Sequence, residues 1–127
     1  MSLKPITVLR RARKLIEDRR SWIKGAFIGK RKGVQCYCSL GALATAAGVK
    51  VKDGQNLSNA AGGSLPNVYY QAHKFLRDAI GGSFIWVPSF NDDKQTRHAQ
   101  VLKAFDKAIA LAQAKKVPAP AQTPSVE

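Results

Sequence analysis

CSLGALATAA, residues 38–47, is the stretch that decides the fold. Apolar side chains stand at nearly every position and leave no polar face; they are Leu40, Ala42, Leu43, Ala44, Ala46 and Ala47. A helix without a polar face has to be covered on most sides by other elements. Gly48 follows as a typical C-terminal stop. The stretch therefore predicts a short, buried helix around which the rest of the chain packs.

Three further segments predict helices that bury one face, because their apolar residues recur at spacings of three and four. The first covers residues 5–18, with Pro5 in its first turn. The second covers residues 67–80 and is followed by two glycines. The third runs from the region of Asp92 to Lys116, and Asp92 with Gln95 three residues later predicts a capping box at its start.

Two segments between these helices predict extended structure. Glycines punctuate residues 22–37, and the basic triplet Lys30, Arg31 and Lys32 is expected at the tip of a short hairpin or strand pair. Residues 84–87 form a second short extended stretch that ends at Pro88. The fold class that follows is mainly α: a compact bundle of about four helices, with a short β-hairpin or strand pair.

Length and composition predict one domain over residues 1–116 and a flexible tail, rich in Pro and Ala, over residues 117–127. No apolar run approaches the roughly 20 residues of a membrane-spanning helix, so we expect no membrane partner. The N-terminus lacks the apolar core of a signal peptide. Cys36 and Cys38 are too close to staple distant parts of a fold, and free thiols suit a reducing cytosol. We therefore expect a cytoplasmic protein.

Positive charge is the strongest functional signal in the sequence. The chain has 21 Lys and Arg residues against 8 Asp and Glu residues, a formal net charge of +13. Eleven of these basic residues but only Glu17 and Asp18 among the acids lie in residues 1–33. Helical pairs of Arg13 with Glu17 and of Lys14 with Asp18 could form at i, i+4 spacing, but they cannot neutralise this surplus. The alternative is an ordinary solvated basic face.

The surplus predicts a surface that binds phosphates, because Lys and Arg displace counterions from a polyanion. Three aromatic residues close by, Trp22, Phe27 and Tyr37, could stack on bases. No zinc-finger, RNP or basic-zipper pattern is present, so sequence-specific reading of DNA is weakly supported. The predicted anion-binding residues are Arg10, Arg11, Arg13, Lys14, Arg19, Arg20, Lys24, Lys30, Arg31 and Lys32.

Metal-binding and acidic sites find little support. Cys36, Cys38, His73 and His98 lack the usual ligand spacing of a metal site, and a free cysteine is more often a small buried hydrophobe. Asn91, Asp92 and Asp93 are better explained as a loop and a helix cap than as an acidic catalytic site. We therefore expect no metal and no cofactor, and we assign no catalytic residue.

A cysteine nucleophile is a third chemical alternative. Cys38 lies at a predicted helix N-terminus, which lowers the pKa of a thiol. His73 or His98 could act as the base, and Asn91 or Asp92 could orient it. Most chains of this length would supply such a trio, so its presence in the sequence carries little weight.

Three blocks of sequence together resemble an uncharacterised family of small proteins from bacteria and their phages. The blocks are Trp22 with Gly25, the Cys38–Leu43 stretch, and Phe90-Asn91-Asp92 leading into residues 101–109. The family pattern has a Cys-x-Leu-Gly-Ala-Leu helix and an aromatic-Asn-Asp turn before the last helix, and the resemblance spans about residues 6–112. It implies a bacterial or phage cytoplasmic setting but no reaction.

The chain departs from this family pattern in the second half. Phe90 stands where tryptophan is frequent, Lys94 where proline is frequent, and Thr96-Arg97 where the order is usually reversed. The shared residues are mostly apolar, glycine or cap-like. Cys38, Gly41, Asn91 and Asp92 therefore fit a signature of the fold better than an active site.

Non-catalytic binding is the function that the sequence favours. The expected partner is a nucleic acid or nucleotide, held by the basic N-terminal surface, and the protein would then be a phage-encoded modulator of host machinery or defence. The first alternative is an adaptor or inhibitor that docks an acidic host protein. The second is a hydrolase or transferase that depends on Cys38.

Overall fold

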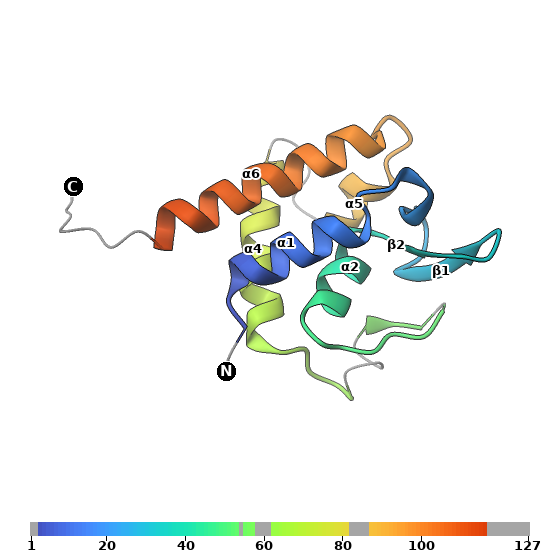
Figure 1. The fold of residues 1–127 in the computed structure, drawn as a ribbon, viewed down its shortest axis with the longest axis horizontal. Helices are drawn as coiled ribbons and strands as arrows, with labels where there is room; N and C mark the ends of the chain where they lie inside the picture. The colour runs from blue at the N-terminus through green and yellow to red at the C-terminus, as the bar shows by residue number, and fades with distance from the viewer. Residues whose placement is uncertain (1–2, 54, 58–61, 82–86, 117–127) are drawn as a thin grey trace.

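The computed structural model describes residues 3–53, 55–57, 62–81 and 87–116. Over these residues the chain is mainly helical, with four helices of seven residues or more and one two-stranded sheet (Figure 1). The elements, in chain order, are α1 (Pro5–Leu15), the 3₁₀ turn η1 (Arg19–Ser21), β1 (Ile28–Arg31), β2 (Val34–Tyr37), α2 (Ser39–Ala46), α4 (Asn67–Ile80), α5 (Val87–Asp92) and α6 (His98–Lys116). The predicted fold class is confirmed. The predicted boundary at residue 116 stays a prediction, and the tail lies outside the described residues.

The short apolar helix α2 is buried on nearly all sides, as its composition predicts. Every residue of α2 except Thr45 is buried. α2 packs against α1, α4 and α5, while α6 lies across α1 and α4 (Figure 1). Phe105 of α6 is the largest fully buried side chain of the described residues, and Leu9 of α1 is among those that follow it. α1, α4 and α5 therefore cover α2, and α6 completes the bundle by packing on α1 and α4.

The hairpin forms where the glycines predicted it. β1 pairs with β2 in antiparallel register, from Ile28 opposite Tyr37 to Arg31 opposite Val34. The two turn residues, Lys32 and Gly33, both have positive φ angles, 52° and 78°. A two-residue hairpin turn of this kind matches the twist of the strands. The basic triplet therefore lies at the tip of the hairpin.

The structure corrects three boundaries. α1 ends at Leu15 and not near Asp18, because Asp18 caps η1 by accepting a hydrogen bond from the backbone N–H of Arg20 at 2.8 Å. The prediction that residues 84–87 are extended is wrong at Val87, because Val87 begins α5. The other residues of that stretch lie outside the described residues. Asp92 is the last residue of α5 and α6 begins only at His98, so the predicted capping box of Asp92 and Gln95 is wrong.

The capping contact of the last helix exists, but it occurs further along the chain. α6 begins at His98, and the side chain of Gln100 accepts a hydrogen bond from the backbone N–H of Arg97 at 2.7 Å. This is the half of a capping box in which the third helical residue reaches back to the cap.

None of the described helices is both long and apolar enough to cross a lipid bilayer.

Candidate functional site

Asn91 is the polar centre of the molecule. It is fully buried on α5, and its Oδ1 accepts hydrogen bonds from Trp22 Nε1 at 2.8 Å, Ser39 N at 3.0 Å and Ser39 Oγ at 2.7 Å. Its Nδ2 donates to the carbonyl of Ile23 at 3.1 Å and to Asp92 Oδ1 at 2.9 Å. Asn91 therefore fixes the segment after η1 against the start of α2.

A basic hollow lies beside Trp22. It has a volume of about 570 Å³ and is lined by Arg19, Trp22, Lys24, Thr96, Arg97, His98 and Ala99. A neighbouring hollow of about 350 Å³ shares Arg19, Trp22 and Lys24 with it and adds Ile23 and Arg31. We call these two hollows together the Trp22 groove. Among the described residues, their linings contain four Lys or Arg residues and one His residue, and no Asp or Glu residue.

Backbone carbonyls hold two of these cations in place. Lys24 Nζ donates to the carbonyl of Asp93 at 2.6 Å and lies 5.4 Å from the centre of the Trp22 ring. Nη2 of Arg31 donates to the carbonyls of residues 19, 20 and 22, at 3.1–3.5 Å. A carbonyl orients a cation without cancelling its charge, so the positive potential of the groove is preserved.

The groove cations have no acidic partners in the part of the chain that the structure describes. Among the described residues, none of Arg19, Lys24, Arg31 and Arg97 forms an ion pair with a carboxylate. His98, the first residue of α6, is bonded through Nε2 to the carbonyl of Ile16 at 2.6 Å, and its ring lies 5.8 Å from that of Trp22. The charge of the groove is therefore available to an anion from outside the chain.

Three of the predicted anion-binding residues are engaged elsewhere. Arg13 Nε lies 2.6 Å from Asp106 Oδ1, and its Nη1 lies 3.4 Å from Glu17. Arg10 donates to the side chain of Gln113, and Arg20 pairs with Asp18 at 2.8 Å. The helical pair of Arg13 and Glu17 forms as its spacing suggests, whereas Lys14 and Asp18 form no ion pair in the described part of the chain.

Four of the remaining predicted cations are exposed and lie away from the groove lining. Arg11 and Lys14 lie on the outer face of α1, and Lys30 and Lys32 lie in or next to the turn of the hairpin. Arg19, Lys24 and Arg31 are thus the predicted anion-binding residues that the structure brings together around Trp22.

The three predicted stacking residues line different hollows. Trp22 lines the groove that bears its name. Phe27 lines a second hollow, together with Gly25 and Ala26, and Tyr37 lines a third one beside Thr45 and Lys50. These rings therefore do not form one continuous stacking surface, and only Trp22 lies among the groove cations.

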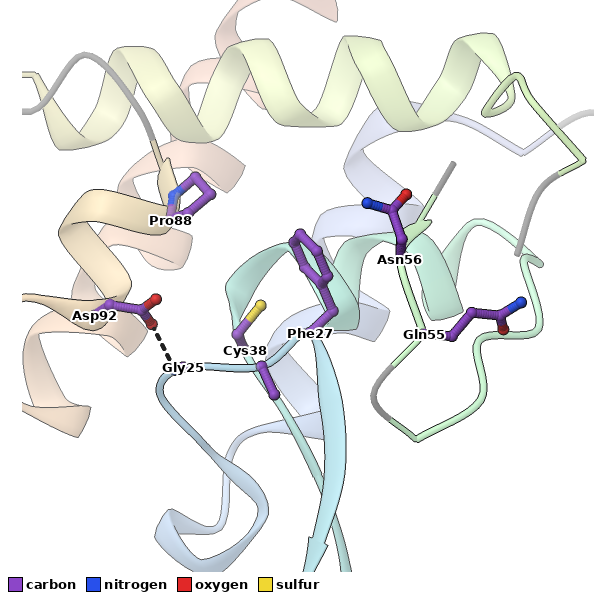
Figure 2. Close-up of a pocket in the computed structure, with 8 residues that line it drawn as sticks. Gly25, Phe27, Cys38, Gln55, Asn56, Pro88 and Asp92 are labelled. Atoms are coloured by element: carbon purple, nitrogen blue, oxygen red, sulfur yellow. Dashed lines mark hydrogen bonds between the residues drawn. The ribbon is translucent and has the colours of Figure 1, made fainter. Parts of the chain in front are cut away.

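The hollow at Phe27 has a different chemistry. It has a volume of about 390 Å³, and the described residues that line it, Gly25, Ala26, Phe27, Cys38, Gln55, Asn56, Pro88 and Asp92, include no Lys or Arg (Figure 2). We call it the Asp92 pocket. Asp92 Oδ1 accepts hydrogen bonds from the backbone N–H of Gly25 at 3.0 Å and from Asn91. A carboxylate is therefore fixed at the wall of a pocket that has an aromatic ring beside it.

Cys38 contributes its thiol to the Asp92 pocket in the protonated form. Burial raises the pKa of Cys38 to about 11, although its Sγ accepts a hydrogen bond from the N–H of Gly41 at 3.4 Å. The start of α2 would lower the pKa of an exposed thiol. Here the loss of hydration dominates, which opposes a role as nucleophile at neutral pH.

Cys38 should therefore resist alkylation in the folded protein. At pH 8 a thiol with a pKa of about 11 is ionised to about one part in a thousand, and burial also blocks access. We expect iodoacetamide to leave Cys38 unmodified over hours in buffer and to modify it readily in guanidinium, as peptide mass spectrometry would show. Alkylation of the folded protein at the rate of a free thiol would contradict this.

The same shift predicts a loss of stability at alkaline pH. The folded pKa of Cys38, about 11, lies above its reference value of 9.0, so the contribution of the neutral thiol is present below about pH 9. It declines as the pH rises towards 11, because the unfolded chain loses the proton first.

The two histidines have other partners than Cys38. His98 is bonded to Ile16, and His73 stacks on Tyr69 with ring centres 5.9 Å apart. Burial, followed by the charge of Arg77, lowers the pKa of His73. The described residues contain no group of three or more His, Cys, Asp or Glu side chains that could hold a metal ion.

Cys36 is fully buried, and its S–H group lies within hydrogen-bond distance of the backbone carbonyls of Arg20 and Val34.

The segment from Asn91 to Asp93 performs a structural task. Asn91 is the buried hub, Asp92 holds Gly25, and Asp93 accepts a hydrogen bond from the backbone N–H of Gln95 at 3.0 Å. The interpretation of residues 91–93 as a loop is correct for Asp93, which lies between α5 and α6. It is wrong for Asn91 and Asp92, which lie in α5.

Sequence reasoning missed the contribution of α6 to the groove. The sequence pattern gives Arg97 no binding role and suggests His98 only as a base or a metal ligand. The sequence signal that could have found them is Gln100, whose side chain can cap a helix that begins at His98. Such a start places Arg97 and His98 at the N-terminus of the last helix. Their distance from Trp22 in the sequence hides that these segments meet.

Comparison with known proteins gives a family and nothing more specific. No curated protein and no solved structure matches the chain. A family model described as "Family of unknown function (DUF6197)" matches residues 1–111, which is most of the chain and includes the Trp22 groove, the Asp92 pocket and Asn91. The predicted membership of an uncharacterised family is thereby confirmed: the chain belongs to the family of unknown function DUF6197.

Proposed function

We propose that the protein binds a nucleic acid or nucleotide without catalysing a reaction, and that the Trp22 groove is the centre of the binding surface. One observation carries the proposal: four Lys or Arg residues line the groove, and none of them has an acidic partner among the described residues. The free energy of such binding comes largely from phosphate contacts and the release of counterions.

The shape of the groove supports a phosphate ligand over a merely solvated basic face. A hollow of about 570 Å³ lies within the range of small-ligand sites, so cations from η1, the segment after it and the start of α6 can surround one phosphate group. Arg19 and Arg97 are exposed and carry guanidinium groups, which can grip a phosphate through two hydrogen bonds. Cations on a flat surface would meet a phosphate from one side only.

Salt dependence and charge-matched variants test the proposal. We expect labelled single-stranded oligonucleotides to bind in fluorescence anisotropy, and the affinity to fall about tenfold when salt rises threefold, as about three phosphate contacts on a single strand require. The variant R19Q/R97Q should lose most of this affinity and show a weaker salt dependence. The control R77Q/K107Q removes the same charge from exposed positions outside the groove and should bind nearly as the native protein does.

The result can contradict either half of the proposal. If no oligonucleotide, mononucleotide or cyclic nucleotide binds even at low salt, the function is wrong. If both double variants weaken binding equally, the net charge and not the groove is responsible.

The biological setting that we propose is the cytoplasm of a bacterial cell, where the protein is a phage-encoded modulator of host machinery or defence. Its support is the resemblance carried by the Cys38–Leu43 and Phe90–Asp92 blocks, together with two free cysteines. An adaptor that docks an acidic host protein would use the same cations. Capture from a lysate separates the two: nuclease treatment releases the cargo of a nucleic-acid binder and leaves the partner of an adaptor in place.

A further inference from the structure

The geometry points to a second ligand site, independent of the proposed function: the Asp92 pocket binds a small molecule that has an apolar body and a protonated amine. The lining residues of this pocket and those of the Trp22 groove do not overlap. Residues 22–27 contribute to both sites: Trp22 and Lys24 line the basic groove, and Gly25, Ala26 and Phe27 line the Asp92 pocket.

The charge of the pocket is the first argument. The chain carries a net charge of +13, yet among the described residues no Lys or Arg lines this pocket, and the acidic side chain of its lining is Asp92. Cys38 is the other ionisable residue of the lining, and its thiol stays protonated there. A cation can therefore enter the pocket without meeting a like charge on its walls, whereas an anion would face the carboxylate.

The placement of Asp92 is the second argument. Both of its hydrogen bonds use Oδ1, which accepts from Gly25 N and from Nδ2 of the buried Asn91. Within the described part of the chain, no donor reaches Oδ2. The carboxylate is thus held in one orientation before a ligand arrives, so an ammonium group that donates to Oδ2 loses little affinity to the ordering of this side chain.

The apolar walls are the third argument. Figure 2 shows Pro88 and Asp92 on α5, with Phe27 and Cys38 next to them and Gln55 and Asn56 on the facing loop. Phe27 is partly exposed, and the small residues Gly25 and Ala26 leave the space in front of it open. An apolar body can lie against Phe27 and Pro88, and the face of an aromatic ring also attracts a cation. The volume of about 390 Å³ is at the small end of ligand pockets.

The probe for this site is 2-phenylethylamine, compared with neutral 2-phenylethanol and anionic phenylacetate. We expect the amine to bind with a dissociation constant of about 1 mM, as its size allows, at least threefold more tightly than the alcohol, and phenylacetate not to bind measurably. Backbone ¹H–¹⁵N spectra report the location, because the N–H of Gly25 is bonded to Asp92. The amide signals of Gly25 and Ala26 should shift when the amine is added, and those of Arg97 and Ala99 should not.

Variants separate the carboxylate from the pocket. Asp92→Asn keeps an oxygen that can accept from Gly25, so the fold should persist, and the preference for amine over alcohol should disappear. Asp78→Asn, at an exposed acid on α4, makes the same change in charge and should preserve the preference. Ala26→Leu fills the pocket and should abolish binding of both probes, which provides a test that does not depend on Asp92.

Three results would overturn the site. The first is phenylacetate binding as tightly as the amine. The second is an unchanged preference in Asp92→Asn. The third is a set of shifted signals that excludes Gly25 and Ala26, which would place the amine elsewhere on the protein.

Discussion

Replacing Asn91 with leucine should destabilise the protein by about 3–5 kcal/mol, the largest effect expected of any single substitution described here. Leucine has a similar size but no hydrogen-bonding groups. It would leave unpaired the indole N–H of Trp22, the backbone N–H and hydroxyl of Ser39, and the carbonyl of Ile23. Each buried group without a partner costs about 1–3 kcal/mol, and partial relaxation towards water reduces the sum.

Urea denaturation followed by circular dichroism measures this loss. An exposed asparagine on α4 provides the control: Asn67→Leu should change the free energy of unfolding by less than about 0.5 kcal/mol. A double-mutant cycle with Ser39→Ala should show coupling between the two sites, because Ser39 Oγ lies 2.7 Å from Asn91 Oδ1. A loss below about 1 kcal/mol in Asn91→Leu would show that the hub is not the polar anchor of the fold.

Replacing Gly41 with alanine should destabilise the protein by about 2–4 kcal/mol, although alanine is the better helix former. A Cβ atom at this position would overlap the carbonyl group of Phe27, with the carbonyl carbon only 2.7 Å away. That carbonyl cannot move freely, because it accepts a hydrogen bond from the backbone N–H of Cys38 at 3.0 Å. The strain therefore falls on the backbone, either in α2 or in the hairpin.

Helix propensity and steric overlap predict opposite signs for Gly41→Ala, so the experiment decides between them. Propensity alone would raise the free energy of unfolding by about 1 kcal/mol. The matched control is Gly29→Ala in β1, where a Cβ atom would meet only the side chain of Ile23 at an ordinary 3.5 Å. We expect the control to unfold within about 1 kcal/mol of the native protein. Stabilisation by Gly41→Ala would mean that α2 and the hairpin are further apart than described.

The position of Gly41 explains why this glycine stands within an otherwise apolar helix. Its sequence context, a helix with alanine or leucine on either side, offers no reason for a residue of low helix propensity. The reason is the close approach of Phe27, which comes from a segment with no helical or periodic signal. The resemblance to a family pattern indicated that Gly41 belongs to a signature of the fold, but only the packing shows which atom excludes the side chain.

The candidate sites show the same division. The surplus of cations in residues 1–33 was evident from the sequence, and so was the presence of Trp22 among them. Which cations remain available was not: Arg13 meets Asp106, 93 positions away in the chain, whereas Arg19 and Lys24 meet Arg97 at the start of α6. Charge counting treats these arginines alike, because it contains no information on which helices lie side by side.

The sequence alone determined α1, α4 and α6 through their periodicity, the burial of α2 through its apolar composition and the hairpin through its glycines, since each follows from neighbours within a few residues. Tertiary structure alone decided the role of Asn91, the separation of the three aromatic rings and the division between a basic groove and an acidic pocket. These depend on contacts between segments 50 or more residues apart, such as those between Asn91 and Ser39. Hydrogen bonds and charges act over a few ångströms, so a chain specifies them only once its helices have packed.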